Sequence, residues 1–412
     1  MSEFHEQRLD NGLRVWLEFM PDVSSAAVGF LVRTGARDEP PEQAGVSHFL
    51  EHMCFKGTPK RDWRQVTVDF DEMGSTYNAF TSKEKTVYFG WVRAADLERQ
   101  TELLADMMRS RLPSEEFETE RKVILEEIAM SEDQLDRHLY ELLHEKIYGE
   151  HPLGWPVLGH TRTVSALQRD QMAAYFEERY NPANLVLIVA GNVPPPRAWS
   201  VAQEVCGAWT ARAPRPPRSR PEIRCGGVAS SRLPRFKQQA VALVYPAPSA
   251  VDPDDETAEA LAAILGGQNS RFFWRIVQAG IAPVASAVRV DYSDNGLMIV
   301  YGFCEPPNAE RLVDALRREI GDLVERGAEG EELQRVKNRR RTSLATESEA
   351  PYYRLMQLAQ DLDMFGRPRN VEERLAAVDA VSVAGLQDYL RRWPMNDEHF
   401  LVSVGPRAWP SE

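Results

Sequence analysis

The sequence has no long hydrophobic run and no cysteine framework. Its four cysteines, Cys54, Cys206, Cys225 and Cys304, form no C-x-x-C pair and no dense cluster, so a disulfide-rich secreted fold is not expected. No apolar stretch approaches the ~20 residues that span a bilayer, and no basic segment followed by an apolar one opens the chain. We therefore expect no membrane-spanning segment and a protein that stays in the cytoplasm.

Positive charge is the minority charge. The chain has 49 lysines and arginines against 62 aspartates and glutamates, which gives a net charge of −13 at pH 7. An acidic surface repels polyanions, so nucleic acid and anionic membranes are not expected as partners. Basic substrates are compatible with this charge balance.

Length and composition fit a globular protein with more than one domain. The 412 residues exceed what one hydrophobic core usually organises. The hydrophobic share of 43% and the charged share of 27% are ordinary for a globular chain.

Histidine is sparse, yet two of the eight histidines stand close together in the segment His48-Phe49-Leu50-Glu51-His52. On a helix this spacing places His48 and His52 one turn apart on one face, with Glu51 beside them. Two imidazoles and a carboxylate then meet near one point, a geometry that zinc prefers, and H-x-x-E-H is a known zinc-peptidase order. Because the motif has only three fixed residues, it can also occur by chance in a chain of this length.

A later segment supplies carboxylates at helical spacing. We expect one helix over 115–148, in which Glu120 and Glu127 are seven residues apart and share a face. Glu127 adjoins apolar residues that should point inward, and a carboxylate beside a buried face needs a partner such as a metal ion. Most glutamates on such a helix are solvated, and for Glu126 we keep that interpretation.

The segment 74–91 reads as two antiparallel strands joined by a polar turn at 82–85. A strand beside a metal site can bind an extended peptide by adding it to the edge of the sheet. Asn78, Ala79 and Phe80 of the first strand are therefore candidate substrate contacts. An ordinary hairpin explains the pattern equally well.

The order of the expected elements repeats after a segment rich in proline and arginine, which we interpret as a stiff extended linker. The first half has strands at 13–18, 26–32 and 185–191 and further helices at 63–73, 95–111 and 165–180. The second half has strands at 239–245, 284–291, 296–303 and 400–405 and helices at 255–265, 306–326, 330–346, 351–364 and 382–392. The expected fold class is α+β, with two tandem homologous α/β halves, each a mixed, mostly antiparallel sheet packed with helices. The predicted domains are 1–206, which carries the metal motif, the linker 207–235, and 236–412, which lacks the motif.

Several segments together resemble the M16 (pitrilysin/insulysin) zinc metallopeptidase family. The matching segments, in chain order, are 48–53, 55–58, 78–81, 123–128, 151–154 and 180–184. The resemblance covers nearly the whole chain and is strongest to the short two-domain members related to the mitochondrial processing peptidase β subunit and its bacterial homologues. It implies a LuxS/MPP-like metallohydrolase fold.

The resemblance also implies a role for each residue of the candidate site. His48, His52 and Glu127 would bind Zn2+, and Glu51 would act as the general base on a peptide substrate. Glu127 stands seventy-five positions after His52, close to the spacing of the family's third ligand. Glu120 matches an acidic position that supports the site by contacting a ligand, which would fix the tautomer that binds metal.

The second half departs from the family pattern at two positions. Many members carry an arginine and a tyrosine there that help to hold the substrate, whereas this chain has Val277 and, one residue early, Pro283. Either Arg275 or another residue replaces the pair, or a related M16 subunit supplies it, since some family members form heterodimers of a zinc-bearing and a zinc-less chain. We favour the related subunit as the partner, with a homodimer as the alternative.

The expected function is zinc-dependent hydrolysis of short or unfolded peptides by the catalytic subunit of a two-subunit metalloendopeptidase. Two alternatives stay open: a non-catalytic structural or interaction subunit that keeps the fold, and a dedicated maturation protease for one precursor peptide. The retained His48, Glu51, His52 and Glu127 argue against the first alternative. Nothing in the sequence addresses the second.

Overall fold

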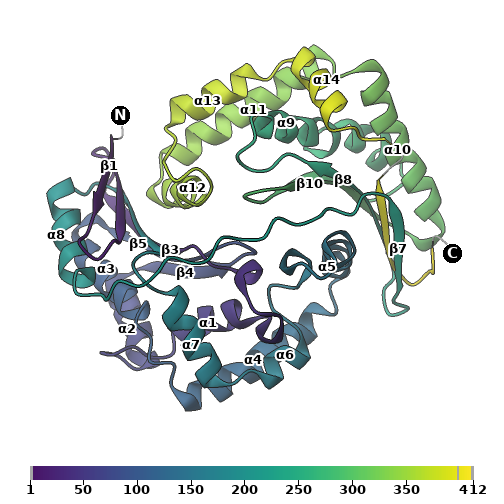
Figure 1. Ribbon diagram of the computed structural model, residues 1–412. Coiled ribbons are helices and arrows are strands. Elements are labelled where there is room, and N and C mark those ends of the chain that lie inside the picture. The colour runs from purple at the N-terminus through teal and green to yellow at the C-terminus, as the bar shows by residue number, and fades with distance from the viewer. Residues whose placement is uncertain (1–2, 397–398, 410–412) are drawn as a thin grey trace. The chain divides into compact units, whose positions relative to one another are not determined.

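The computed structural model describes residues 3–396 and 399–409, which form two compact units (Figure 1). Unit 1 comprises the residues up to 129 together with 155–219 and 346–369, and unit 2 comprises 130–154, 220–345 and the residues from 370 on. Each unit therefore contains one segment from the other half of the sequence. The prediction placed the domain boundaries at 206 and 235, so that each domain is one continuous segment. It did not include the exchange of 130–154 and 346–369 between the two units.

Unit 1 is built on a six-stranded sheet with the order β1-β2-β6-β3-β5-β4. The strands are β1 (Glu3–Arg8), β2 (Arg14–Phe19), β3 (Ser25–Val32), β4 (Thr76–Thr81), β5 (Thr86–Arg93) and β6 (Leu185–Gly191). All neighbours are antiparallel except β2 and β6. The central strands β3 and β6 are apolar and buried along almost their whole length, because both faces of the sheet are covered.

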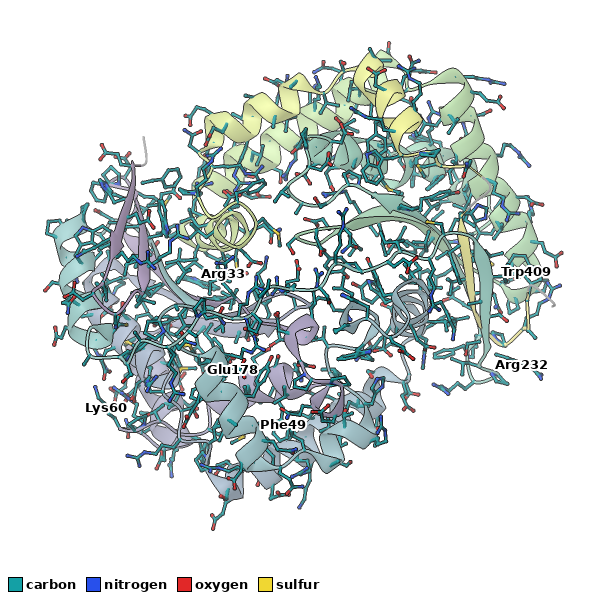
Figure 2. All side chains as sticks on the ribbon, viewed as in Figure 1. Arg33, Phe49, Lys60, Glu178, Arg232 and Trp409 are labelled. Atoms are coloured by element: carbon teal, nitrogen blue, oxygen red, sulfur yellow. The ribbon has the colours of Figure 1, made fainter. Side chains whose placement is uncertain are left out.

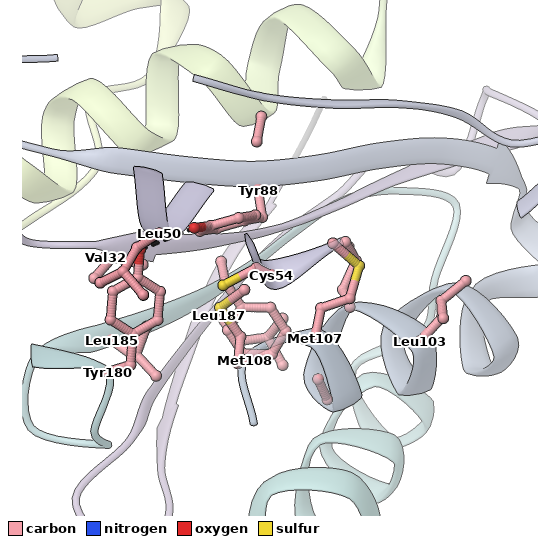
Figure 3. Close-up of a cluster of buried hydrophobic side chains, with 14 of the residues drawn as sticks. Val32, Leu50, Cys54, Tyr88, Leu103, Met107, Met108, Tyr180, Leu185 and Leu187 are labelled. Carbon is pink, nitrogen blue, oxygen red and sulfur yellow. Dashed lines mark hydrogen bonds between the residues drawn. The ribbon is translucent and has the colours of Figure 1, made fainter. Parts of the chain in front are cut away.

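Different helices cover the two faces of this sheet. One face packs against α1 (Val46–Cys54), α2 (Trp63–Met73), α3 (Leu97–Met107), α4 (Ser114–Ser131), α6 (Thr161–Ala166), α7 (Arg169–Arg179) and α8 (Pro195–Cys206). Figure 3 shows part of this core, in which Leu50 and Cys54 of α1 lie near Tyr88 of β5. The other face carries α12 (Pro351–Met364), whose Leu355 and Leu362 share a buried cluster with Ile188 of β6.

A buried ion pair fixes α12 to the sheet of unit 1. Arg354 Nε donates to both carboxylate oxygens of Glu18, at 2.9 and 2.8 Å, and each side chain is only 1% exposed. Removing one partner of such a pair leaves a buried charge uncompensated, at a cost of about 3–5 kcal/mol. Charge and apolar contact together therefore hold this helix from the second half of the sequence in unit 1.

Unit 2 repeats the plan with a five-stranded sheet in the order β7-β11-β8-β10-β9. Its strands are β7 (Gly227–Arg232), β8 (Gln239–Ala247), β9 (Val284–Asp291), β10 (Gly296–Cys304) and β11 (Phe400–Gly405), of which only β7 and β11 are parallel neighbours. Its helices are α5 (Leu135–Tyr148), α9 (Asp255–Gly266), α10 (Ala309–Arg326), α11 (Gly330–Ser348), α13 (Val371–Ala380) and α14 (Val383–Arg392). α5 covers one face, with Leu143 and Ile147 in a cluster with Val402 of β11, and α9, α10 and α14 contribute to the core on the other.

The α+β class and the two halves of similar plan are confirmed. α9 follows β8 as α1 follows β3, and the hairpin of β9 and β10 corresponds to that of β4 and β5. The exchanged helices also correspond, because α5 follows the long helix α4 and α12 follows the long helix α11.

Two segments that were each predicted as one helix are divided between two helices in the structure. The segment 115–148 forms α4 and α5, and Gln134 between them has extended backbone angles of φ −106° and ψ 112°. This break lies close to the passage of the chain from unit 1 to unit 2. The segment 165–180 likewise divides between α6 and α7, with extended Leu167 and Gln168 between them. Neither break contains proline or glycine, the residues that mark helix ends most clearly, so composition gave no signal.

The predicted linker is extended only in part. Residues 210–225 have no helix or strand, as their proline content predicts, but β7 lies inside the predicted linker and pairs with β11. Arg218 donates to both oxygens of Asp38, at 2.9 and 2.7 Å, and to Glu84 at 3.1 Å. This arginine is therefore neutralised by carboxylates of unit 1 and is not presented to an external polyanion.

The sequence has neither a disulfide pattern nor a long apolar run, and the structure agrees with both observations. None of the four cysteines forms a disulfide, and only Cys225 is exposed. Within residues 3–396 and 399–409, no helix combines the length and the apolarity that crossing a bilayer requires.

Candidate metal centre

Helix α1 has one fully buried face and one face with polar side chains. Phe49, labelled in Figure 2, is fully buried together with Leu50 and Met53, and its ring stacks on Phe117 of α4 with 4.7 Å between centroids. The histidines of the motif are on the other side of the helix and are partly exposed, His48 to 14% and His52 to 22% of the side chain. The apolar face thus anchors the helix and leaves the histidines available to a ligand.

The N-terminus of α1 is held by a buried carboxylate. Glu39 accepts hydrogen bonds from the backbone N–H groups of Gly45 and Ser47, each at 2.7 Å. Burial raises the pKa of Glu39 to about 8, although both N–H donors act in the opposite direction. Gly45 has a φ of 99°, and a Cβ atom there would lie 2.7 Å from the Leu158 carbonyl oxygen, so glycine is required. These contacts fix where α1 begins and hence where its histidines project.

Three side chains from two helices meet at one point. The ligand atoms of His48, His52 and Glu127 all lie within 4.8 Å of one another, and no other such group of histidine, cysteine or acidic residues occurs in the described part of the chain. The Nε2 atoms of both histidines are 3.8 Å from Glu127 Oε2. α1 supplies the two imidazoles and α4 supplies the carboxylate.

This arrangement fits a zinc ion. Ligand atoms bound at about 2.0–2.2 Å to a tetrahedral zinc lie roughly 3.4 Å apart. The observed spacing of 3.8 Å from each imidazole nitrogen to the Glu127 oxygen therefore needs only small side-chain shifts. Two imidazoles and one carboxylate are also a donor set of catalytic zinc sites, in which the fourth position stays open.

Glu120 contacts one of the ligands from the buried side. Its Oε2 lies 3.1 Å from His52 Nδ1, and its Oε1 lies 2.7 Å from Lys56 Nζ. A proton held on Nδ1 by this contact leaves Nε2 of the same ring for the metal. Burial raises the pKa of Glu120, but the hydrogen bonds from His52 and Lys56 outweigh burial and hold it below its usual value. Glu120 is therefore ionised when it meets His52.

Glu51 is held separately from the three ligands. The Thr81 hydroxyl donates to Glu51 Oε2 at 2.5 Å, and the Thr81 backbone N–H also hydrogen-bonds to this carboxylate. Burial raises the pKa of Glu51, and the two donors of Thr81 oppose the increase. A raised pKa moves a carboxylate toward the range in which it serves as a general base.

The pKa of His52 is raised by the carboxylates around it. Burial alone would lower this pKa, but the hydrogen bond to Glu120 and the negative charges of Glu127 and Glu51 outweigh burial. A proton and a zinc ion therefore compete for His52.

The predicted substrate contacts lie on the edge strand β4, next to α1. Asn78 and Phe80 are exposed, whereas Ala79 is buried. The backbone N–H of Ala79 donates to Asn78 Oδ1 at 2.9 Å. The position of these residues suits peptide addition, and their role in binding stays a prediction.

In unit 2, Val277 ends a short π-helix that spans Phe273–Val277. Arg275 in this helix donates to Glu319 at 2.8 Å and to Asp322 at 3.1 Å, so its charge is balanced within unit 2. Replacement of the missing arginine and tyrosine, by Arg275 or by a partner subunit, stays a prediction.

Three residues to which sequence reasoning gave no role contact the candidate site or the helix that carries its histidines. Lys56 is four residues after His52, so helical spacing could have placed it beside that histidine. Thr81 ends the strand that carries the predicted substrate contacts, yet nothing in its position indicates that it meets Glu51. Glu39 lies before α1, in a segment without periodicity, and gave no signal.

The chain matches two family descriptions that follow one another along the sequence. "Insulinase (Peptidase family M16)" matches residues 14–161, and "Peptidase M16 inactive domain" matches residues 166–340. The first range contains every residue of the metal centre, and the second, which begins in unit 1 and continues into unit 2, contains none of them.

Bacterial relatives are similar along most of their length. The chain is 31% identical over 386 residues to an uncharacterized zinc protease of Rickettsia felis, with 92% of this chain and 93% of the relative covered. It is 34% identical over 385 residues to one from Mycobacterium tuberculosis, with 91% and 87% covered. A zinc protease of Bacillus subtilis, also named as uncharacterized, is 29% identical over 402 residues, with 96% and 97% covered.

Solved structures share the fold at low sequence identity. A protease from Helicobacter pylori superposes with a TM-score of 0.92 at 20% identity, covering 98% of this chain and 100% of that one. A chain from Pseudomonas fluorescens described as a peptidase M16 inactive domain gives a TM-score of 0.89 at 16% identity, with 98% of both chains covered. The fold expected from the sequence is thus confirmed.

Proposed function

Because the chain belongs to the M16 (insulinase) peptidase family, we propose that it is a zinc metalloendopeptidase that hydrolyses short or unfolded peptides. The observation that carries the proposal is the convergence of His48, His52 and Glu127, with Glu51 left outside the ligand set. A purely structural cluster would not need a separately held carboxylate beside three metal ligands.

The residues of the site divide the chemistry between them. Zinc held by His48, His52 and Glu127 would supply a Lewis acid, which would lower the pKa of a bound water toward about 7. Glu51 accepts a proton from the attacking water and transfers it to the leaving amine. Thr81 holds Oε2 of Glu51 and so fixes the carboxylate that accepts the proton. Glu120 keeps the proton of His52 on Nδ1.

The open edge of β4 is the surface that we propose for the peptide. An extended peptide that adds to a sheet edge forms main-chain hydrogen bonds, which do not depend on its sequence. The Ala79 N–H, now bound to Asn78 Oδ1, is a donor for a peptide carbonyl. Folded proteins rarely expose extended backbone with unpaired groups, so this mode selects short or unfolded substrates.

We further propose that a related M16 subunit completes the site, with a second copy of this chain as the alternative. The reason is that Val277 and Pro283 offer neither a cation nor a phenol where family members hold the substrate. Size-exclusion chromatography of the chain purified from its native source, followed by identification of co-purifying chains, tests this part. Full peptidase activity of the isolated monomer would contradict it.

A non-catalytic subunit is the second candidate, and the description "inactive domain" favours it only for residues 166–340. The metal centre lies outside that range. We place the enzyme in the cytoplasm, which agrees with the lack of disulfides among its four cysteines.

The test is hydrolysis of an unstructured peptide by the purified full-length chain, followed by mass spectrometry of the products. We expect internal cleavage that a chelator abolishes and that added zinc restores. No cleavage with zinc present, either alone or with the co-purified partner, would contradict the proposed function.

A further inference from the structure

Unit 2 has a pocket of about 190 Å3 between α9 and α11, with α13 at its margin. Its apolar wall is formed by Ala260 and Ala263 of α9 together with Val336 of α11. Acidic side chains reach it from α9, and basic side chains reach it from α11. The pocket therefore combines an aliphatic wall with opposite charges on two facing helices.

This pocket corresponds in position to the metal centre of unit 1. α9 corresponds to α1, and α11 corresponds to α4, in the order of elements of the two units. Val336 and Ser343 stand six and thirteen residues after the first residue of α11, as Glu120 and Glu127 do after the first residue of α4. Both Val336 and Ser343 line the pocket. The second half thus keeps a cavity where the first half has its ligands.

The lining of the pocket does not suit a metal ion. It contains no histidine or cysteine, and the position that corresponds to Glu127 is Ser343. Lys337, Arg339 and Arg340 bring three positive charges from α11, which repel a cation. Glu256 and Glu259 offset two of these charges, and the remaining positive charge favours an occupant that offers an anionic group to the α11 side.

One of these cations has an unused buried donor. Arg339 donates to the Gln268 carbonyl at 2.9 Å, and Lys337 donates to the Asp379 carbonyl at 2.8 Å. Arg340 Nε, in contrast, is buried and has no hydrogen-bond acceptor in the described part of the chain. Its distance of 3.6 Å from Glu256 Oε1 is too long for a hydrogen bond. A buried N–H without an acceptor is unfavourable, and a carboxylate in the pocket would supply one.

The acidic side chains of the pocket come from α9. Glu259 is an exposed residue that lines the pocket, and the positive charges of Arg289 and Arg340 act on its carboxylate. We propose that the pocket binds a free amino acid with an aliphatic side chain. Its carboxylate binds Arg340, its ammonium group binds Glu259, and its side chain lies against the wall formed by Ala260, Ala263 and Val336.

The size of the pocket selects a single amino acid over a peptide. Sites for drug-sized ligands measure about 300–1,000 Å3, and this pocket, at 190 Å3, is smaller. The complementary charges require both an ammonium and a carboxylate on the same small molecule. The proposal does not depend on peptidase activity, because no residue of the metal centre takes part.

The direct test is calorimetric titration of the full-length, zinc-loaded chain with L-leucine. We expect saturable binding with a dissociation constant of about 1 mM or below, which a ligand of this size can reach. N-acetyl-L-leucine lacks the ammonium group and L-leucinamide lacks the carboxylate, so each should bind at least about tenfold more weakly. No saturable binding of L-leucine, or equal binding of the three compounds, would overturn the proposal.

Variants locate the site. Arg340→Gln and Glu259→Gln should each weaken L-leucine binding at least about tenfold, because each removes one charged contact. Arg335→Gln is the matched control, since this exposed arginine lies on the same helix but does not line the pocket, and it should leave binding unchanged. Unchanged melting temperatures show that the variants fold, and the zinc-free wild type should bind L-leucine as the loaded protein does. Wild-type affinity in Arg340→Gln would overturn the assignment even if the proposed peptidase function holds.

Discussion

The hydroxyl of Thr81 donates a hydrogen bond of 2.5 Å to Oε2 of Glu51. Thr81 is the last residue of the edge strand β4, and Glu51 lies on the metal-binding helix α1. The carboxylate proposed as the base is thereby fixed to the strand proposed to bind the peptide. A peptide that adds to β4 would meet the base at a set distance.

Thr81→Val should lower kcat and leave KM and zinc content unchanged. Valine has nearly the shape of threonine but cannot donate to Glu51, and a hydrogen bond to a charged group contributes about 1.5–3 kcal/mol, which corresponds to a fall of about 10–100-fold. Steady-state kinetics with an unstructured peptide measure the effect. Thr81→Ser keeps the hydroxyl and should restore most of the rate, whereas equal losses in both variants would contradict the positioning role.

Glu120→Gln should weaken zinc binding about 10–100-fold, because the contact that holds His52 in its metal-binding tautomer loses its charge. Competition with a chromophoric chelator measures the dissociation constant. Glu126→Gln is the matched control, since Glu126 is exposed on the same helix and outside the ligand group. Equal zinc affinity in both variants would show that Glu120 has no such role.

As the pH is lowered, zinc affinity should begin to fall at a higher pH than it would if His52 had the pKa of an ordinary histidine. Zinc needs neutral His52, and the carboxylates that surround His52 raise its pKa above the usual 6.5. The folding stability of the metal-free protein should depend on pH in the opposite direction. Protonated His52 stabilises the fold at low pH, and this contribution disappears as the pH rises through the raised pKa of His52. Zinc affinities measured between about pH 5 and 8 should show an inflection that moves to lower pH in Glu120→Gln. An inflection that stays in place would contradict this cause of the shift.

Arg354→Met should destabilise unit 1 by about 3–5 kcal/mol, because it leaves the buried carboxylate of Glu18 without its counter-charge. Replacing both residues by methionine should recover most of the loss. Denaturant unfolding measures the change in the free energy of unfolding, and hydrogen exchange of the α12 amides shows whether this helix is the part that loosens. Arg99→Met removes an exposed pair with Glu72 in the same unit and should cost less than about 1 kcal/mol. If the two arginine variants lose equal stability, the buried pair does not anchor α12.

The features that the sequence predicted well depend on short-range spacing. The helix with the H-x-x-E-H motif is present as α1, and the predicted turn at 82–85 lies between β4 and β5. Glu127 was identified by its distance along the chain from His52 and by its place beside apolar residues, and it lies with the histidines. Periodicity and turn residues sufficed for the helix and the turn because neighbours in the sequence decide both, whereas the assignment of Glu127 as a ligand followed from the resemblance to the family.

The features that the sequence did not predict depend on tertiary contacts. The apolar residues of α5 and α12 show helical spacing, but nothing in them indicates that each helix packs on the sheet formed by the other half. β1, α8 and α13 were not predicted either. The contact of Thr81 with Glu51 joins residues thirty positions apart on a strand and a helix, and only the folded chain brings them together.

The most direct test of the account is to measure zinc content and peptide hydrolysis in the same preparations of the wild type and Glu51→Gln. Glu51 is not a ligand in the proposed site, so both proteins should hold one zinc ion per chain, while the variant loses at least about 100-fold in rate because it cannot accept the proton. A variant that hydrolyses the peptide at the wild-type rate, or a wild type that binds no zinc, would contradict the assignment of this helix as the catalytic metal site.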